Sequence, residues 1–566
     1  MAKDPLFGEI LVANGVITPE QLEQALAEQQ RSGERLGTVL LRLNYIEEEH
    51  VFAPFLAQQL QIEYQPLGNR MVDPEVLSRI PASVAVRYQV LPLECNHQTL
   101  TVAVSDPLNM ALRDVLSTLW NGQINMVFAT RKDITEAVRQ HYGVGAETLD
   151  ALNKDGVPVP DQQEGVQDIT EIKSEASIGK FLNQILLEGY QRRATDIHIE
   201  PYEQDLKVRY RIDGVLYDVQ TPRNLWRFRD SLASRIKIMA RLNIAEKRMP
   251  QDGRFKVKVG DVDLDLRVSF MPSAFGESVV LRLLTAGALY NLKDLGLGEQ
   301  HLEQVRDLLK RPHGIIFVTG PTGSGKTTTL YACLNRLNHT EQKIITIEDP
   351  IEYQIKDVIQ IQVNPAIGLS FAAGLRSSLR HDPDVMMVGE VRDRETAEIA
   401  VQVALTGHLV FSTLHTNDAA SAVTRLLDMG VEPYLIASAV QCFIAQRLVR
   451  RICPRCRRET KISAEVLKDL GIPVGQLEGT VLYEGEGCDQ CHFSGYYGRV
   501  GVFEFLELDD RLRTMIMEKA AASDIRRAAD RAGMAGLAED GWRKVREGLT
   551  TPAELVRILK QDNTEM

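Results

Sequence analysis

One short stretch of the sequence could bind the phosphates of a nucleotide. Residues 320–327 read Gly-Pro-Thr-Gly-Ser-Gly-Lys-Thr and match G-x-x-x-x-G-K-[ST], the pattern of a phosphate-binding loop. Glycines let backbone N–H groups close around phosphate oxygens, and the start of the next helix adds partial positive charge. Lys326 is expected to contact the β- and γ-phosphates, and the Thr327 hydroxyl to ligate Mg²⁺. The predicted nucleotide-binding residues are Gly320, Pro321, Thr322, Gly323, Ser324, Gly325, Lys326, Thr327 and Thr328.

The sequence around this loop predicts the strand–turn–helix setting that phosphate binding requires. Residues 315–318 form an apolar run before the loop, and residues 328–334 follow it with helical character. An ordinary glycine turn between a strand and a helix is the alternative, but every position of the motif is filled. The sequence therefore predicts a bound nucleoside triphosphate.

Two later apolar runs end in carboxylates. Residues 344–347 lead into Glu-Asp-Pro-Ile-Glu, which ends at Glu352, and residues 384–388 lead into Gly-Glu, which ends at Glu390. The second run looks like a Walker B segment with glutamate in place of the usual aspartate. Parallel strands end at one sheet edge, where nucleotides bind. Mg²⁺ needs one or two carboxylates and the hydrolytic water needs another, so Glu352 and Glu390 are the candidates. The sequence does not assign which of them activates the water, and Glu390 is predicted to ligate Mg²⁺ beside Thr327.

A third apolar run, residues 409–414, is followed by His415. A histidine in this position is often a hydrogen-bonded structural residue. Next to a nucleotide, its ring could instead sense the γ-phosphate or hydrogen-bond across it. His415 is therefore a candidate member of the catalytic site.

Four of the seven cysteines form two C-x-x-C pairs, Cys453 with Cys456 and Cys488 with Cys491. The segment between the pairs is predicted to be a helical insertion. Four thiolates at this spacing suit a closed structural Zn²⁺ site. A redox dithiol or an iron–sulfur cluster is the alternative, but neither has its usual sequence context here. We predict a zinc knuckle over residues 453–491.

The length of 566 residues predicts several domains of an α/β multidomain protein. Residues 1–142 are predicted to dock or regulate, with a tandem helical repeat at 5–60 and a small α/β unit at 66–142. An acidic flexible linker is expected at 143–177 and a central α/β domain at 178–290. Residues 291–566 would carry the phosphate loop, the zinc motif and a helical C-terminal tail.

The central domain contains three arginines of interest, Arg254, Arg267 and Arg282, and two of them lie in runs that alternate like strands. Composition alone favours solvated side chains at these positions. In a multi-subunit nucleoside triphosphatase, arginines can instead act as fingers on the γ-phosphate.

Composition excludes some classes of function. The net charge of -12 argues against a whole-protein role on DNA, RNA or anionic lipid. No apolar run is long enough to cross a bilayer, and the first residues do not read as a signal peptide. The expected location is the cytoplasm, with any membrane contact made through partners.

The motifs together resemble the secretion ATPase superfamily, which includes type II secretion ATPases and type IV pilus assembly ATPases. The resemblance covers essentially the whole chain, including Asp-Ile-His-Ile-Glu-Pro at residues 196–201, the phosphate loop, both acidic segments and the segment through His415. It implies ATP as the nucleotide, a PAS-like central domain and a RecA-like C-terminal domain. It further implies a hexamer at the inner-membrane cytoplasmic face, a nucleotide site completed by the three arginines, and a zinc knuckle linked to the membrane platform. Tyr434 and the Phe-Ser-Thr at 411–413 are closer to the type II branch.

The N-terminal repeat resembles the tandem motif by which related ATPases bind cyclic di-GMP. The second copy contains Arg-Leu-Gly at 35–37, but the first has Leu6 at the arginine position and the second has Asn44 at the mid-motif glycine. Because an arginine offers a planar charged partner that leucine lacks, a plain helical adaptor is the alternative. The candidate cyclic di-GMP residues are Gln29, Arg35, Leu36, Gly37 and Gln58.

The sequence is thus interpreted as a hexameric ATPase that powers type II secretion by assembling a pseudopilus. Its expected partners are an inner-membrane platform protein and the cytoplasmic domain of a secretion or pilus assembly protein. Type IV pilus assembly is the near alternative. A nucleic-acid translocase and a non-hydrolysing cyclic di-GMP sensor are the more distant ones, and the acidic composition argues against the translocase.

Overall fold

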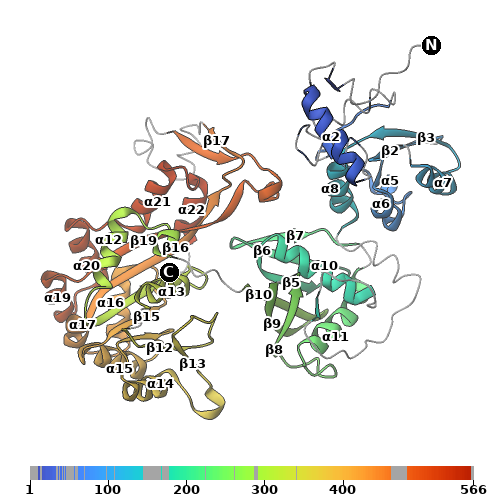
Figure 1. The fold of residues 1–566 in the computed structure, drawn as a ribbon. Coiled ribbons are helices and arrows are strands. Elements are labelled where there is room, and N and C mark those ends of the chain that lie inside the picture. The colour runs from blue at the N-terminus through green and yellow to red at the C-terminus, as the bar shows by residue number, and fades with distance from the viewer. Residues whose placement is uncertain are drawn as a thin grey trace. The chain divides into compact units, whose positions relative to one another are not determined.

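The structure is a computed structural model of the chain that describes residues 11–12, 16–32, 36, 39–40, 43, 45, 57, 62–68, 70–96, 98–107, 109–143, 167–168, 177–222, 225–260, 262–285, 291–338, 341–460 and 481–561. The chain divides into two compact units, Met1–Leu283 and Leu284–Met566, which Figure 1 draws. Within these described ranges, no helix combines the length and the apolar character that spanning a lipid bilayer would take.

The first unit contains a small α/β domain on a three-stranded sheet. Strand β1 (Val90–Cys95) pairs antiparallel with β2 (Thr99–Val104), which pairs in parallel with β3 (Gln123–Phe128). A parallel pair needs a crossover, and helix α7 provides it between β2 and β3. The helices of this region are α2 (Pro19–Ser32), α5 (Pro74–Leu77), α6 (Ala82–Tyr88), α7 (Met110–Leu119) and α8 (Arg131–Tyr142).

The rest of the first unit is built on a seven-stranded sheet of order β4-β8-β9-β10-β5-β6-β7. Alternate residues of its strands are buried, so one face packs on the helices and the other carries polar side chains. The Tyr210 hydroxyl joins the two layers by donating to the Ile185 carbonyl at 2.9 Å. The elements are β4 (Gln167–Asp168), α10 (Ser177–Gln191), β5 (Ala194–Pro201), β6 (Leu206–Ile212), β7 (Val215–Val219), η2 (Leu225–Phe228), α11 (Arg229–Met239), β8 (Gln251–Val259), β9 (Val262–Ser273) and β10 (Gly276–Thr285).

The second unit is organised by a seven-stranded sheet of order β13-β12-β14-β15-β11-β16-β19. All neighbouring strands are parallel except β16 and β19, which run antiparallel. Its central strands are buried along their whole length, as expected for a parallel sheet covered on both faces. The strands are β11 (Gly314–Thr319), β12 (Ile344–Glu348), β13 (Ile359–Gln362), β14 (Val385–Val388), β15 (Leu409–Leu414), β16 (Val440–Ile452) and β19 (Tyr496–Glu507).

Helices cover both faces of this second sheet (Figure 1). Alternate side chains of β11 enter different cores, since Ile316 and Val318 pack with α12 and α13 while Ile315 and Phe317 pack with the later helices. The helices are α12 (Glu299–Leu308), α13 (Lys326–Leu337), α14 (Phe371–Ser378), α15 (Arg394–Leu405), α16 (Ala419–Asp428), α17 (Pro433–Ala439), α19 (Asp510–Met517), α20 (Ala522–Arg531), α21 (Leu537–Arg546) and α22 (Pro552–Gln561), with 3₁₀ turns η3 (Leu292–Leu295), η4 (Pro365–Ile367), η5 (Leu379–His381) and η7 (Asp489–Cys491).

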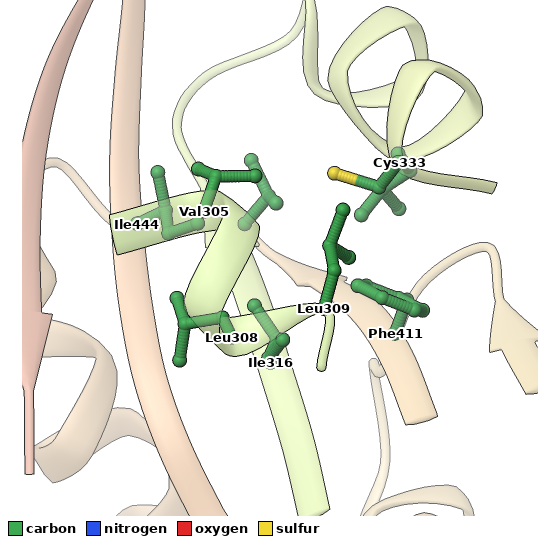
Figure 2. A pocket seen from close by; sticks show the side chains of 9 residues that line it. Val305, Leu308, Leu309, Ile316, Cys333, Phe411 and Ile444 are labelled. Atoms are coloured by element: carbon green, nitrogen blue, oxygen red, sulfur yellow. The ribbon is translucent and has the colours of Figure 1, made fainter. Parts of the chain in front are cut away.

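Figure 2 shows a small apolar cavity on the face of the sheet that α12 and α13 cover. Its lining comes from both helices and from three strands, and includes the sulfur of Cys333. Burial raises the pKa of the Cys333 thiol to about 12. This cysteine therefore stays protonated and acts as a small apolar side chain that packs between α13 and the sheet.

A two-stranded hairpin of β17 (Arg457–Thr460) and β18 (Leu482–Gly485) projects from the ends of β16 and β19. One cysteine pair directly precedes β17 and the other follows β18. The segment between the two cysteine pairs was predicted as a helical insertion. Its described parts are the strands β17 and β18, and residues 461–480 between them lie outside the described residues. The predicted fold class, an α/β multidomain chain with a RecA-like phosphate-loop domain, is confirmed. The domain boundaries expected from the sequence stay predictions.

Candidate functional site

The phosphate loop connects β11 to α13 at the carboxyl edge of the parallel sheet. β11 ends at Thr319 and α13 begins at Lys326. In the sheet, β11 lies between β15 and β16, so the loop follows an interior strand. Helix α13 presents its unpaired first-turn N–H groups to this edge. Of the other predicted loop residues, Thr322 is exposed, and Pro321, Thr327 and Thr328 are half-buried. A bound phosphate could therefore contact these loop residues and cover them.

Two glycines of the loop are required by close packing against β16. A Cβ atom on Gly320, whose φ is +150°, would lie 2.6 Å from the Gln446 carbonyl oxygen and equally close to the Ser324 hydroxyl. A Cβ on Gly325, whose φ is +88°, would lie 2.8 Å from the Gln446 side-chain nitrogen. Substitution at either position would therefore move the loop or the strand beside it.

The side chains inside the loop fit a bound phosphate. The Lys326 ammonium donates to the carbonyl oxygens of Gly320 at 2.7 Å and Pro321 at 3.1 Å, which holds it over the loop. Burial lowers the pKa of Lys326 to about 8, although the nearby Glu390 carboxylate raises it. The Ser324 hydroxyl is buried, and no hydrogen-bond partner for it exists among the described residues. A phosphate oxygen would satisfy this group.

The structure brings Glu390 and His415 together near Lys326. Glu390 follows the end of β14 by two residues, and its side chain is 12% exposed. One of its oxygens lies 3.3 Å from His415 Nε2, and the other lies 2.5 Å from an Arg392 nitrogen. Burial first, and then the charge of Lys326, lower the pKa of His415. A neutral histidine beside a carboxylate can hydrogen-bond to a phosphate oxygen or a water molecule.

Glu352, the other predicted catalytic carboxylate, is half-buried four residues beyond the end of β12. The backbone of Glu352 lies close enough to the Tyr331 hydroxyl to affect the pKa of this tyrosine. Because Tyr331 belongs to α13, the segment that carries Glu352 is tied to the phosphate-loop helix.

Sequence reasoning assigned no role to Glu348, the last residue of β12. This carboxylate is 2% exposed and accepts hydrogen bonds from the Tyr331 hydroxyl, from Thr346 Oγ1 at 2.6 Å and from Gln360 Nε2 at 3.0 Å. Burial, followed by the charge of Glu348, raises the pKa of Tyr331 above its usual range, so the tyrosine remains a donor. The network fixes the start of the segment that leads to Glu352.

Replacing Tyr331 with phenylalanine is expected to lower the free energy of unfolding by about 1–3 kcal/mol, because a buried carboxylate loses one of its donors. Thermal denaturation of the full chain measures this change. Tyr434→Phe is the matched control, since Tyr434 is 55% exposed and its loss should leave the melting temperature unchanged. Equal melting temperatures for Tyr331→Phe and the wild-type chain would contradict the role given to the network.

The four predicted zinc ligands converge at the base of the β17–β18 hairpin. Their sulfur atoms all lie within 4.8 Å of one another. Cys453 and Cys488 are 3.7 Å apart, Cys456 and Cys491 are 3.8 Å apart, and Cys488 and Cys491 are 3.7 Å apart. A tetrahedral zinc ion with Zn–S bonds of about 2.3 Å would separate its sulfur ligands by about 3.8 Å. The observed spacing therefore fits Zn²⁺.

Backbone groups around the cysteines also suit a metal-bound thiolate. The Gly487 N–H lies 3.3 Å from Cys456 Sγ, and the Cys488 N–H lies 3.2 Å from Cys491 Sγ. Such N–H donors stabilise negative charge on a ligand sulfur. All four positions are occupied by protein ligands, so a bound Zn²⁺ would hold the hairpin together and leave no open position for chemistry.

The three predicted finger arginines lie on the polar face of the central sheet in the first unit. Arg254 of β8 is exposed and is paired in register with the half-buried Arg267 of β9. Arg282 of β10 is 57% exposed and donates from Nε to the buried Asp196 carboxylate at 2.8 Å. Their contribution to a nucleotide site stays a prediction.

Most of the predicted cyclic di-GMP residues, Arg35, Gly37 and Gln58, lie outside the described residues, as do Leu6 and Asn44. Gln29 lies on α2, and both Gln29 and Leu36 are half-buried. Of the expected acidic linker, the structure describes the two residues of β4 and the end residues 143 and 177. Dinucleotide binding therefore stays a prediction.

A phosphate loop at the carboxyl edge of a parallel sheet, with a carboxylate and a histidine near its lysine, defines a phosphate-loop nucleoside triphosphatase. The family described as "Type II/IV secretion system protein" matches residues 171–557, and the MshEN domain matches residues 60–148. The first match covers more than half of the sequence. The chain therefore belongs to the type II/IV secretion system protein family, and it is an ATPase.

Individual relatives cover nearly the whole chain. The type IV pilus assembly ATPase PilB of Myxococcus xanthus is 41% identical over 97% of this chain and 98% of its own length. Type II secretion system protein E of Pseudomonas aeruginosa is 44% identical over 86% of this chain and 97% of its own length. The X-ray structure of the Legionella pneumophila ATPase DotB has a TM-score of 0.50 and 21% identity, and covers 73% of this chain and 100% of that one, a likeness of fold.

Proposed function

We propose that this chain is the motor of a type II secretion system, which uses ATP hydrolysis to assemble a pseudopilus of pilin-like subunits. The gathering of Lys326, Glu390 and His415 at the phosphate loop carries the proposal, together with membership of a family of secretion proteins. The motor is a homo-hexamer in this proposal. It acts at the cytoplasmic face of the inner membrane, against a platform protein and the cytoplasmic domain of a secretion or pilus assembly protein.

Each candidate residue has a proposed role in hydrolysis. Lys326 holds the β- and γ-phosphates, and Thr327 and Glu390 hold Mg²⁺, which when bound offsets the charge of the triphosphate. Glu352 orients the attacking water, and His415 hydrogen-bonds near the γ-phosphate. Arg254, Arg267 and Arg282 stabilise the transition-state charge. Zn²⁺ at the four cysteines keeps the hairpin folded.

Type IV pilus assembly is the second candidate, supported by the full-length similarity to PilB of Myxococcus xanthus. Deletion of the gene in its host separates the two. The type II proposal predicts that secreted proteins accumulate inside the cells while surface pili remain. Loss of surface pili with normal secretion would refute it and support pilus assembly.

We further propose that the N-terminal region regulates the motor by binding cyclic di-GMP through Gln29, Arg35, Leu36, Gly37 and Gln58. The Arg-Leu-Gly at 35–37 and the MshEN match that follows it support this proposal. Calorimetric titration of the full chain with cyclic di-GMP is expected to show saturable heat that Arg35→Ala abolishes. If the wild-type chain gives no heat of binding, the proposal is refuted and the N-terminal repeat is interpreted as a plain helical adaptor.

A further inference from the structure

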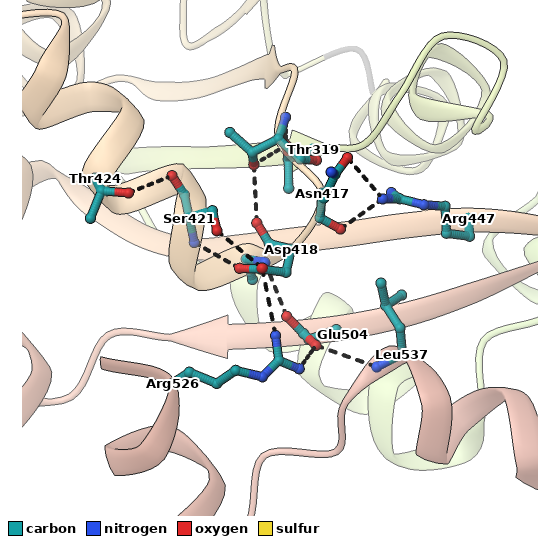
Figure 3. Close-up of polar contacts among 11 residues, drawn as sticks. Thr319, Asn417, Asp418, Ser421, Thr424, Arg447, Glu504, Arg526 and Leu537 are labelled. Carbon is teal, nitrogen blue, oxygen red and sulfur yellow. Dashed lines mark hydrogen bonds and ion pairs between the residues drawn. The ribbon is translucent and has the colours of Figure 1, made fainter. Parts of the chain in front are cut away.

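A buried carboxylate on β19, Glu504, connects three elements behind the phosphate loop. Its side chain is completely buried, and it accepts hydrogen bonds from the Ala419 N–H at 3.0 Å, the Leu537 N–H at 3.3 Å and an Arg526 nitrogen at 2.7 Å. Figure 3 shows these contacts converging on Glu504 from α16, α20 and α21. A carboxylate in such a position requires this compensation, because an unpaired buried charge costs several kcal/mol.

The geometry also makes Glu504 a cap for two helices. Ala419 is the first residue of α16, and Leu537 is the first residue of α21. N–H groups at these positions have no partner inside their own helices, and the helix dipole favours an anion there. A single carboxylate therefore fixes the starts of two helices relative to β19, and Arg526 of α20 balances its charge.

Arg526 also reaches the residue that precedes α16. Its second terminal nitrogen lies 3.8 Å from Asp418 Oδ2, while Asp418 caps α16 by accepting from the Ser421 N–H at 2.7 Å. The Glu504 and Asp418 charges raise the pKa of Arg526 against the opposing effect of burial, so the guanidinium stays charged. The start of α16 is thus held from two sides.

The start of α16 follows closely after His415 in the chain. Residues 416–418 connect His415 to α16, and their backbone is fixed at both ends. The Thr416 N–H donates to Thr319 Oγ1 at 3.0 Å, directly before the phosphate loop, and Arg447 donates to the Asn417 carbonyl at 2.8 Å (Figure 3). The same loop places His415 3.3 Å from Glu390. A shift of α16 would therefore be transmitted to the histidine.

We propose that Glu504 and Arg526 are positioning residues, which hold the 415–418 loop so that His415 faces Glu390 during ATP hydrolysis. Neither residue touches the nucleotide site itself. The inference rests on hydrolysis at the phosphate loop, and it links the C-terminal helices α20 and α21 to the rate of that step. Motion of these helices would change turnover through the loop.

The chain contains a matched ion pair that serves as a control. Glu554 of α22 is also completely buried, and it accepts from Arg557 at 2.7 and 2.8 Å and from Arg450 at 2.8 and 3.0 Å. The arginine exposures match, since the side chain of Arg557 is 35% exposed and that of Arg526 is 36% exposed. No contact between Glu554 and the 415–418 loop occurs in the part of the chain that is described. Arg557→Gln therefore perturbs stability without perturbing the loop.

The test compares Arg526→Gln, Arg526→Lys and Arg557→Gln in the full zinc-loaded chain, by steady-state phosphate release and thermal denaturation. Arg526→Gln is expected to lower kcat at least about tenfold, the cost of one misplaced polar group, while KM for ATP stays within about threefold because the phosphate loop is intact. Arg526→Lys is expected to keep part of kcat. The lysine retains the positive charge, but its single ammonium group cannot contact the Glu504 and Asp418 carboxylates at once as the guanidinium does. Arg557→Gln should leave kcat unchanged.

Equal kcat in Arg526→Gln and Arg557→Gln would overturn the inference, as would losses of kcat that simply follow the melting temperatures of the variants. If Arg526→Gln does not fold, Arg526→Lys decides the question, because a wild-type kcat in that variant would exclude a positioning role. The failure of the wild-type chain to release phosphate would refute the ATPase assignment together with the inference. If the wild-type and Arg557→Gln chains hydrolyse ATP normally, the ATPase assignment stands, and the Arg526 variants then test the positioning inference alone.

Discussion

Replacing Lys326 with alanine is expected to lower kcat for ATP hydrolysis by at least about 10²-fold, since a preorganised charge at the transferred phosphate is lost. The Lys326 ammonium also bridges the carbonyl oxygens of Gly320 and Pro321, so the variant loses the group that spans the mouth of the loop. Phosphate release and the binding of a fluorescent ATP analogue measure the change. The fold should persist, because Lys326 is not part of either hydrophobic core of the second unit.

Lys310→Ala is the control for this prediction. Lys310 has a side chain that is 75% exposed and pairs with Asp307 on the surface at 2.8 Å. Its removal should change neither kcat nor nucleotide binding. Substantial ATPase activity in Lys326→Ala, with wild-type activity in Lys310→Ala, would show that hydrolysis takes place somewhere other than the phosphate loop.

Serine at Cys488 is expected to abolish zinc binding and unfold the hairpin. Structural zinc sites bind their ion with about 10–16 kcal/mol in small domains, and that free energy contributes directly to folding. Metal analysis should find about one zinc ion in each wild-type chain and none in Cys488→Ser. Limited proteolysis should then cut the variant within residues 453–460 and 481–491, where the zinc-bound wild-type chain is expected to resist.

Cys95→Ser provides the matched control for zinc binding. Cys95 lies at the end of β1, outside the four-cysteine cluster, and is half-buried. This variant should retain its zinc and its resistance to protease. Zinc retained in full by Cys488→Ser would contradict the assignment of the cluster.

The phosphate loop and the sheet edge could be predicted because their signals are local. Gly320 to Thr327 is a contiguous motif, and fully apolar runs such as 385–388 indicate buried parallel strands by themselves. The separate placing of Glu390 and His415 near the nucleotide rested on a topological rule, since neighbouring parallel strands end at one edge. The four cysteines likewise carry their spacing in the sequence.

The contacts of the buried carboxylates around the site could not be predicted, because the sequence does not show which Glu and Asp side chains become buried. Glu348 and Glu352 belong to one short acidic motif, yet Glu348 is locked by Tyr331 and Gln360 while Glu352 remains half-buried. Glu504 gives no sequence signal of its role, since its partners Ala419 and Arg526 lie 85 and 22 residues away. Contacts of this kind arise from tertiary packing and not from any local pattern.

The arginines of the central sheet show the same limit. The sequence suggested solvated side chains for them, while their pairing comes from the strand register, which places Arg254 opposite Arg267. The pairing of Arg282 with Asp196 joins β10 to β5, which are separated by several other elements in sequence. A single arginine in a strand does not reveal such a partner.

The most direct test of the account is steady-state phosphate release by the purified, zinc-loaded chain, with ATP and Mg²⁺ varied independently. The account predicts saturable release that requires Mg²⁺ and that Lys326→Ala abolishes. No release above background, even with platform protein and lipid supplied, would contradict it.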